Sequence, residues 1–231
     1  MEIELRFFLS GEPFLHPTLC EFIKIATTMG FNQTLVHTNG TMIDRYLDEI
    51  VSCGLSTISI SIDGWEREMY ESARCGGSFE KVVANTKALI SLHGKRPNIV
   101  IQTIVPYGAD LESARKKMIG LLPGADDYYV RHPHSWHLSG LISDAAPVDY
   151  SEAGTCFPHS FMSIYADGRV PVCCADLNGE YIVGDAKIQS LSYLWNLGLK
   201  KFRERIEERL PIPEICDRCE RYISRRRVIA V

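Results

Sequence analysis

Four cysteines in the last third of the chain have the spacing of metal ligands. Cys156 and Cys173 lie on either side of an Asp-Gly turn, and Cys216 and Cys219 form a C-x-x-C. Four thiolates gathered from two separate places suit tetrahedral zinc or an iron–sulfur cluster equally well. Cys174 is left out, because neighbouring side chains of a strand point to opposite sides. We therefore predict a metal centre at Cys156, Cys173, Cys216 and Cys219, and the spacing leaves the metal open.

A second group of polar residues follows three predicted strands. A glycine there permits close approach of a ligand to the backbone, and a glutamate accepts a hydrogen bond from an ammonium group. An arginine can hold a carboxylate with its bidentate fork. Such a set suits a ligand with an amine, a carboxylate and a ribose. The candidate ligand-binding residues are Ser10, Gly11, Glu12, Pro13, Thr38, Asn39, Ser61, Asp63 and Arg74.

The elements that position these residues alternate between strand and helix. The apolar patterns predict strands at 3–9, 34–37, 57–62, 98–105 and 127–131, and helices at about 17–30, 42–53, 79–93 and 111–122. Connections of this length favour a parallel sheet with helices outside, either an open wound sheet or a partial barrel. In both, ligands bind at the carboxyl ends of the strands.

The pattern changes in the second part of the chain. The Asp167-Gly168 pair between apolar runs at 162–165 and 170–173 is typical of a β-hairpin. A short helix at about 191–196 and a charged helix at 199–210 precede the C-x-x-C. We place the domain boundary near residue 150, which gives domains of 1–149 and 150–231.

Composition excludes several classes of protein. The net charge is −4 and the pI about 6.0, so no nucleic-acid surface is expected. No apolar run approaches the length that spans a membrane. Met1 to Leu9 does not have the pattern of a signal peptide, and the eight cysteines are expected to be ligands or buried thiols rather than disulfides. We expect a cytoplasmic protein.

With these motifs the sequence resembles radical S-adenosylmethionine (SAM) enzymes that carry a C-terminal SPASM- or twitch-type iron–sulfur domain. Ser10–Pro13 is similar to the family's GGEP motif, with serine for the first glycine. Gly168-x4-Cys173 resembles the opening of the SPASM motif, and Gly184-Asp185 and Leu194-Trp195 are similar to later landmarks. The resemblance implies an α/β fold, in which a partial (β/α) barrel precedes a small α+β iron–sulfur domain with a β-hairpin.

The resemblance also implies cofactors and a reaction. The GGEP-like motif would bind the amine of SAM, and Ser61, Asp63 and Arg74 would contact its carboxylate or ribose. The four cysteines would hold an auxiliary [4Fe–4S] cluster. The intact protein, an oxidoreductase or maturase, would cleave SAM to a 5′-deoxyadenosyl radical and abstract hydrogen from a peptide or small-molecule substrate. Flavodoxin or ferredoxin would donate the electron, and His132, His134, Trp136 and His137 could line the substrate side.

Two departures from the family pattern matter. There is no cysteine after Cys219, which favours the shorter twitch type. The chain also contains no C-x3-C-x2-C, the motif that holds the SAM-cleaving cluster. We expect an N-terminally truncated piece that is inactive alone and whose second [4Fe–4S] cluster occurs only in a full-length form. The alternative is a degenerate, non-catalytic iron–sulfur or zinc protein that acts as a binding module.

Overall fold

The computed structural model describes residues 3–92, 94, 96–133 and 160–208. The chain divides into two compact units, Met1–Pro133 and His134–Val231, which are described separately below. The domain boundary expected near residue 150 falls between 134 and 159, outside the described residues. In the part of the chain that is described, no helix is long and apolar enough to cross a membrane.

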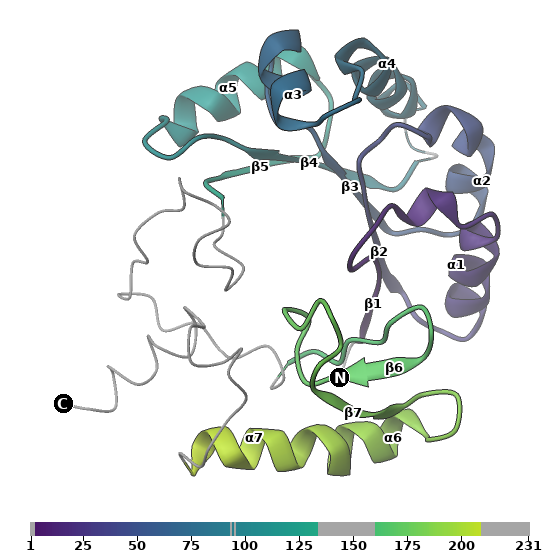
Figure 1. The fold of residues 1–231 in the computed structure, drawn as a ribbon. Coiled ribbons are helices and arrows are strands. Elements are labelled where there is room, and N and C mark those ends of the chain that lie inside the picture. Colours follow the sequence, from purple (N-terminus) through teal and green to yellow (C-terminus); the bar gives the residue numbers. More distant parts are fainter. Residues whose placement is uncertain (1–2, 93, 95, 134–159, 209–231) are drawn as a thin grey trace. The chain divides into compact units, whose positions relative to one another are not determined.

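The first unit contains a five-stranded sheet in which every neighbouring pair of strands is parallel. The strands are adjacent in the order of the chain, and helices cover one side of the curved sheet (Figure 1). This arrangement confirms the predicted α/β partial barrel. The strands are β1 (Glu4–Phe7), β2 (Gln33–Thr38), β3 (Thr57–Ser61), β4 (Asn98–Ile104) and β5 (Asp127–Arg131).

The helices of this unit follow the strands, with three differences from the prediction, one of which is the unexpected short helix at Pro13–Leu15. The helix expected at 42–53 is divided at Tyr46, whose φ of −122° leaves the helical region and whose ring packs 5.4 Å from that of Phe14. Helix α3 was not predicted, because its seven residues bury only Tyr70 and show no apolar period. The helices are η1 (Pro13–Leu15), α1 (Leu19–Thr28), η2 (Ile43–Arg45), α2 (Leu47–Ser52), α3 (Arg67–Ala73), α4 (Phe79–Ile90) and α5 (Leu111–Leu121).

The two faces of the sheet differ in chemistry. Alternate strand residues such as Val36, Ile60 and Ile101 are fully buried in the core beneath the helices. The residues between them point to the other face, because side chains alternate along a strand. That face carries polar groups, among them His37 and Gln102, both half-buried. The face is therefore mixed, since alternation also places the apolar Val100 and Ile104 of β4 on it.

Strand β1 lies at one end of the sheet and, among the described residues, pairs only with β2. Its exposed positions carry charges: Glu4 and Arg6 form an ion pair in which both side chains are more than a third exposed. Within the described part of the chain, the strand therefore presents charged side chains along an edge that pairs with no other strand.

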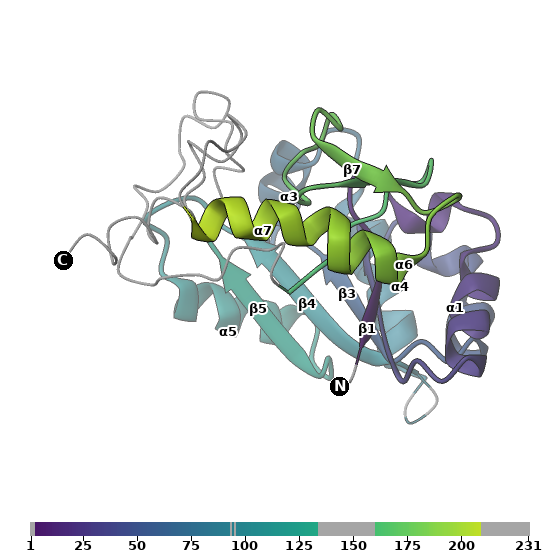
Figure 2. The same cartoon turned by 90° about the horizontal axis from the view of Figure 1, so that it is seen from below.

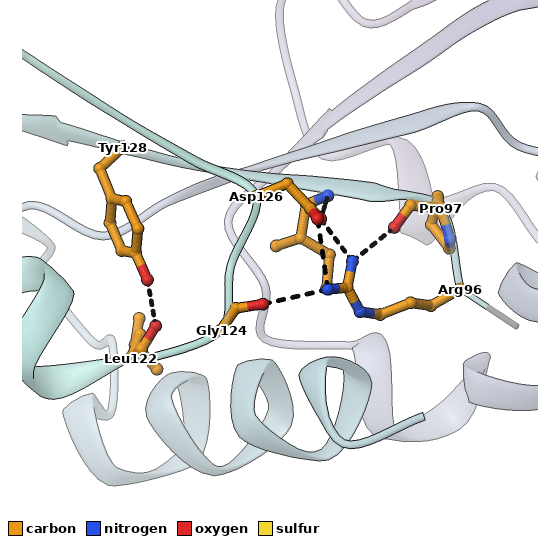
Figure 3. A network of polar contacts seen from close by, with 7 residues as sticks. Arg96, Pro97, Leu122, Gly124, Asp126 and Tyr128 are labelled. Atoms are coloured by element: carbon orange, nitrogen blue, oxygen red, sulfur yellow. Dashed lines mark hydrogen bonds and ion pairs between the residues drawn. The ribbon is translucent and has the colours of Figure 1, made fainter. Parts of the chain in front are cut away.

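A polar network fixes the amino ends of β4 and β5 (Figure 3). The guanidinium of Arg96 donates to the carbonyl oxygens of Pro97 at 3.1 Å and Gly124 at 3.0 Å, and it pairs with the carboxylate of Asp126. Asp126 also accepts a hydrogen bond from Ile99 N at 2.7 Å. Arg96 holds the pKa of Asp126 below its ordinary value. The network ties the turn before β5 to the start of β4, at the edge opposite the strand-end motifs.

The second unit has a small antiparallel pair of strands followed by helix (Figures 1 and 2). The pair confirms that a hairpin is present, but its partners differ from the prediction, since 170–173 was expected to pair with 162–165. The elements are β6 (Arg169–Pro171), β7 (Ile182–Asp185), α6 (Leu191–Tyr193), the π-helical turn η4 (Leu194–Gly198) and α7 (Leu199–Glu207).

The change of partner has a local cause. The expected turn exists, since Gly168 N donates to Tyr165 O at 2.9 Å. Beyond β6, however, the buried carboxylate of Asp176 accepts hydrogen bonds from Glu180 N at 2.9 Å and Tyr181 N at 2.8 Å. These bonds fold the chain back, so that 182–185 meets β6.

Candidate functional site

The carboxylate of Glu12 joins the loops that follow β1 and β2. Its Oε1 accepts hydrogen bonds from Phe14 N at 3.2 Å and Thr38 Oγ1 at 2.6 Å, and its Oε2 accepts one from Asn39 N at 2.7 Å. Gly11 before it has a φ of 121°, a conformation that favours glycine. A carboxylate has about four lone-pair positions, so Glu12 keeps about one for a ligand. The main role of the Glu12 carboxylate is therefore to hold the two loops together.

The loop Thr38–Gly40 is held in place by its own side chains. Asn39 Oδ1 accepts hydrogen bonds from Thr41 N at 2.9 Å and Thr41 Oγ1 at 2.7 Å. A Cβ at Gly40, where φ is 77°, would lie 2.7 Å from Val82 Cγ2 of α4. Asn85 of α4 donates to Gly40 O at 2.9 Å. The loop is therefore preformed and fixed against a helix.

Asp63 and Arg74, two predicted ligand-binding residues, form an ion pair with each other. The Nε and Nη2 atoms of Arg74 lie 2.9 and 2.7 Å from Asp63 Oδ2. Asp63 Oδ1 accepts a hydrogen bond from Ile104 N at 2.9 Å, which ties the loop after β3 to the end of β4. The side chain of Arg74 is 28% exposed, against 13% for Asp63. A ligand carboxylate that binds Arg74 would thus share it with Asp63.

Ser61, the last residue of β3, contacts a histidine that the sequence analysis did not single out. His37 Nε2 of β2 lies 2.5 Å from Ser61 Oγ, and the ring of Phe8 lies 5.4 Å from that of His37. Burial lowers the pKa of His37, and the charges of Arg74 and Arg131 lower it further. The imidazole is therefore neutral at neutral pH. The signal that could have found it is the period of two, which places His37 and Ser61 on the same face.

Gln102 of β4 and Arg131 of β5 form a second pair that the sequence analysis missed. With the Gln102 amide oriented to satisfy its neighbours, its side-chain oxygen accepts hydrogen bonds from Arg131 Nε and Nη2, each at 3.2 Å. Arg131 Nη1 donates to His132 O at 3.1 Å. Burial lowers the pKa of Arg131. In their strands Gln102 and Arg131 lie on the face opposite the buried core residues. The alternation of side chains along a strand could therefore have indicated both as residues of the site.

The aromatic candidates beyond β5 are only partly described. The Nδ1 atom of His132 lies 3.1 Å from Pro106 O, and its ring lies 5.2 Å from the ring of Tyr107. The other three candidates lie outside the described residues: His134, Trp136 and His137.

The strand-end residues fit the amino-acid part of SAM in chemical type. Arg74 can donate to a carboxylate, and Ser61 can donate or accept. The exposed turn at Ser10 and Gly11 leaves backbone groups open to an ammonium group. Pro13, at the start of η1, sets the direction of the chain after Glu12. The predicted site residues of the first unit are thus brought to one edge of one sheet.

Of the four predicted metal ligands, the structure describes Cys173; Cys156, Cys216 and Cys219 lie outside the described residues. The hydrogen bond with Cys174 and burial raise the pKa of Cys173, and the N–H of Ala175, 3.5 Å from Cys173 Sγ, opposes this. Cys173 and Cys174 lie in a bend and a turn beyond β6, and their thiols share a hydrogen bond. The reason for leaving out Cys174, the alternation of a strand, was therefore wrong. No cluster of three potential metal ligands occurs among the described residues.

The glycine landmarks of the second unit have steric causes. A Cβ at Gly184 would lie 2.3 Å from Gln189 Oε1 and 2.4 Å from Leu194 Cδ2. At Gly168, whose φ is 90°, a Cβ would lie 2.9 Å from Asp185 Oδ1. The two glycines let the turn before β6 and the strand β7 pack closely against their neighbours.

Comparison with known families decides what this arrangement is. Residues 2–118, which are 117 of the 231 residues, match the model of the radical SAM superfamily. The chain belongs to the radical SAM superfamily. Residues 156–220 match a second model, the SPASM iron–sulfur cluster-binding domain. The recognition made from the strand-end motifs and the cysteines is confirmed, and radical SAM and SPASM domains imply SAM and [4Fe–4S] clusters.

Curated relatives within the superfamily differ in their reactions. The chain is 40% identical over 76 residues to a GTP 3',8-cyclase of Chlorobaculum tepidum, a match that covers 32% of this chain and 23% of that protein. It is 36% identical over 85 residues to a 7,8-dihydro-6-hydroxymethylpterin dimethyltransferase of Methanocaldococcus jannaschii, covering 35% of this chain and 17% of the other. The chain thus spans less than a quarter of the length of these two radical SAM relatives.

A solved structure is also similar. The structure of TYW1 with a lysine-pyruvate adduct bound matches with a TM-score of 0.44 and 25% identity, over 57% of this chain and 42% of that one.

Proposed function

We propose that this chain is the SAM-binding and auxiliary-cluster portion of a radical SAM enzyme that removes hydrogen from a peptide or small-molecule substrate. The observation that carries the proposal is the strand-end cluster: Glu12, Ser61 and the Asp63–Arg74 pair converge on the carboxyl edge of five parallel strands, within the span of the radical SAM match. When bound, SAM and a [4Fe–4S] cluster supply the radical that takes the hydrogen atom.

The role of the chain's own residues is to bind SAM and to orient it. Glu12 holds the loops after β1 and β2 together, which would fix the backbone around Gly11 for the binding of the ammonium group of SAM. Arg74, oriented by Asp63, offers its guanidinium to a carboxylate. We place the protein in the cytoplasm, with flavodoxin or ferredoxin as electron donor. The chain holds no C-x3-C-x2-C, so we expect it to bind SAM without cleaving it.

SAM affinity tests the strand-end cluster. Isothermal titration calorimetry with SAM should show saturable binding to the chain and a loss of about tenfold or more in Arg74→Gln, because a charge-assisted hydrogen bond contributes about 1.5–3 kcal/mol. Arg67→Gln is the matched control, since Arg67 forms an exposed ion pair with Glu80 of α4. Equal losses in the two variants, or no binding of SAM to the unaltered chain, would contradict the proposal.

Metal content tests the second unit. Four thiolates suffice for one [4Fe–4S] cluster, so after anaerobic reconstitution we expect about four irons per chain and an absorbance band at about 400 nm. Cys216→Ala and Cys219→Ala should each lose the metal, whereas Cys75→Ala, which removes an exposed cysteine of the first unit, should not. Stoichiometric zinc without that absorbance would favour the zinc alternative.

The binding-module alternative rests on the absence of C-x3-C-x2-C from these 231 residues. A module that has lost its chemistry has no need to bind SAM. Saturable SAM binding that depends on Arg74 therefore favours the enzyme, and a chain that binds metal but no SAM favours the module.

A further inference from the structure

The Gln102–Arg131 pair lies on the sheet face that the helices leave uncovered. In the register of the parallel strands, Ser61 is opposite Gln102, and Ile104 is opposite Arg131. Paired residues of neighbouring strands point to the same face, and alternation places Gln102 and Ile104 together. Arg131 is thus on the same face as Ser61, and its position at the end of β5 brings it to the carboxyl edge, on the last strand of the sheet (Figure 1).

Arg131 differs from the other half-buried arginines of the first unit in its partners. Among the described residues, its hydrogen bonds go to two neutral oxygens, that of the Gln102 amide and the carbonyl of His132. No described carboxylate lies within ion-pair distance of it, and the nearby Asp63 is engaged by Arg74 and Ile104 N. The other half-buried arginines each lie within 4.0 Å of a carboxylate: Arg74 with Asp63, Arg96 with Asp126 and Arg115 with Asp127.

Among the described residues the half-buried charge of Arg131 has no counter-ion. An unpaired charge of this kind is costly, so we expect its partner to arrive with a ligand. A guanidinium carries five N–H donors, and the hydrogen bonds to Gln102 and His132 use three of them. Two donors remain, one on each Nη atom. Gln102 fixes the plane of the Arg131 guanidinium. A guanidinium that is already fixed loses less conformational freedom when it binds an anion.

The described groups around Arg131 do not pair with its charge. His37 is neutral, and the positive field of Arg74 and Arg131 contributes to the lowering of its pKa. Asp63 offsets Arg74, with which it is paired. Among the described groups beside Arg131, therefore, none offsets its charge by a direct ion pair.

We propose that Arg131, oriented by Gln102, binds an anionic group of the substrate, a carboxylate or a phosphate, on the uncovered face of the sheet. This inference rests on the proposed function and deepens it, because it assigns Arg74 to the cofactor and Arg131 to the substrate. It restricts substrates to molecules that present a carboxylate or a phosphate to the strand-end edge. Gln102 is a positioning residue that acts through Arg131.

The test is an NMR titration of the full ¹⁵N-labelled chain, which follows the side-chain Nε–H signals of its arginines. The Arg131 signal is assigned by its loss in Arg131→Lys, and those of Arg74 and Arg45 in the same way. Three ligands are added separately: SAM, tripolyphosphate as the phosphate source and succinate as the carboxylate source. We expect the Arg131 signal to shift saturably with one of the two anions, and the Arg74 signal to shift with SAM.

Two variants sharpen the result. Gln102→Glu places a carboxylate against the guanidinium as an internal counter-ion, so the anion affinity at Arg131 should fall about tenfold or more. Arg131→Lys keeps the charge and loses the fork, so anion affinity measured on neighbouring backbone signals should fall several-fold. Arg45 is the matched control, since it is exposed and forms no ion pair with a described residue.

Each outcome of the titration supports or overturns the anion site at Arg131. An Arg131 signal that shifts no more than that of Arg45, or one that shifts with SAM and with neither anion, overturns the inference. Unchanged anion affinity in Gln102→Glu overturns the positioning role. If SAM moves no arginine signal while one anion still moves Arg131, the proposed SAM site fails and the anion site stands.

Discussion

At the scale of the residue, Glu12 shows why a motif can be recognised without its contacts being known. Its place after a strand and beside Gly11 indicated a ligand site, and the residue does lie at the strand-end edge. Its partners Thr38 and Asn39 come from 26 and 27 residues further along the chain. Local patterns carry no information on contacts at that separation, so the carboxylate's structural task could not be predicted.

The same limit applies to the charged pair. Asp63 and Arg74 were each assigned to a ligand from their residue type alone. The structure shows that each satisfies the other at 2.7 Å, a fact that depends on the path of the chain through α3. His37 and Arg131 were missed for a different reason: single polar residues inside strands were interpreted as part of the sheet rather than as part of a site.

His37 gives a prediction on pH. Its folded pKa lies below its ordinary value of 6.5, because burial disfavours the imidazolium. As pH falls through about 6.5, the unfolded chain binds a proton that the folded chain does not, so the contribution of His37 to stability is present above this pH and lost below it. Urea unfolding between about pH 7.5 and about pH 5.5 should show a flatter pH dependence in His37→Gln than in the unaltered chain.

His16→Gln is the control for His37, since His16 is exposed. It should leave the slope of stability against pH close to that of the unaltered chain. An identical slope in His37→Gln and the unaltered chain would show that His37 titrates alike in both states.

At the scale of the element, the strands of the first unit were predicted more accurately than its helices. A strand such as Asp127–Arg131 is specified by local alternation, and its observed bounds equal the predicted ones. The division of the helix at Tyr46 depends on a contact with Phe14, and the pairing of β6 with β7 depends on the loop that Asp176 closes. Both are tertiary effects that a local apolar pattern does not contain.

The loop after β2 gives a prediction at this scale. Gly40→Ala should lower the free energy of unfolding by about 2–6 kcal/mol, because it adds a steric clash with Val82 to the cost of a positive φ, each worth about 1–3 kcal/mol. Gly30→Ala is the matched control: Gly30 also has a positive φ, of 94°, but a Cβ there meets nothing within 4 Å. Chemical denaturation measures both.

The difference between the two variants isolates the close packing of the loop against α4. If Gly30→Ala costs as much as Gly40→Ala, backbone strain alone explains both and the loop is not tightly packed. SAM affinity should fall in Gly40→Ala and stay unchanged in Gly30→Ala, because only the first disturbs the loop that Glu12 holds.

At the scale of the molecule, the first unit separates stabilising and ligand-binding groups to opposite edges of its sheet. The network of Arg96 and Asp126 lies at the amino ends of the strands, whereas Glu12, Ser61 and Arg74 lie at the carboxyl ends. Parallel strands allow this separation because all carboxyl ends share one edge. Substitutions at the amino edge should therefore change stability without changing SAM affinity.

Asp126→Asn tests this separation. The folded pKa of Asp126 lies below its ordinary value of 3.8, so its contribution to stability is present above that pH and lost as pH falls through the folded pKa. The variant should be less stable than the unaltered chain at neutral pH and should lose less on acidification to about pH 3. Asp48→Asn, an exposed substitution in α2, is the control. A change in SAM affinity in Asp126→Asn would show that the two edges are coupled.

The charged edge strand has a consequence for the behaviour of the protein at high concentration. The free backbone groups of an edge strand are a template on which the strand of a second molecule can assemble, and charged side chains on the edge oppose this. On β1, Glu4 and Arg6 place one charge of each sign at exposed positions. Among the described residues β1 pairs with β2 alone, so replacing both by apolar residues should make this edge a site at which a second molecule of this chain can add a strand.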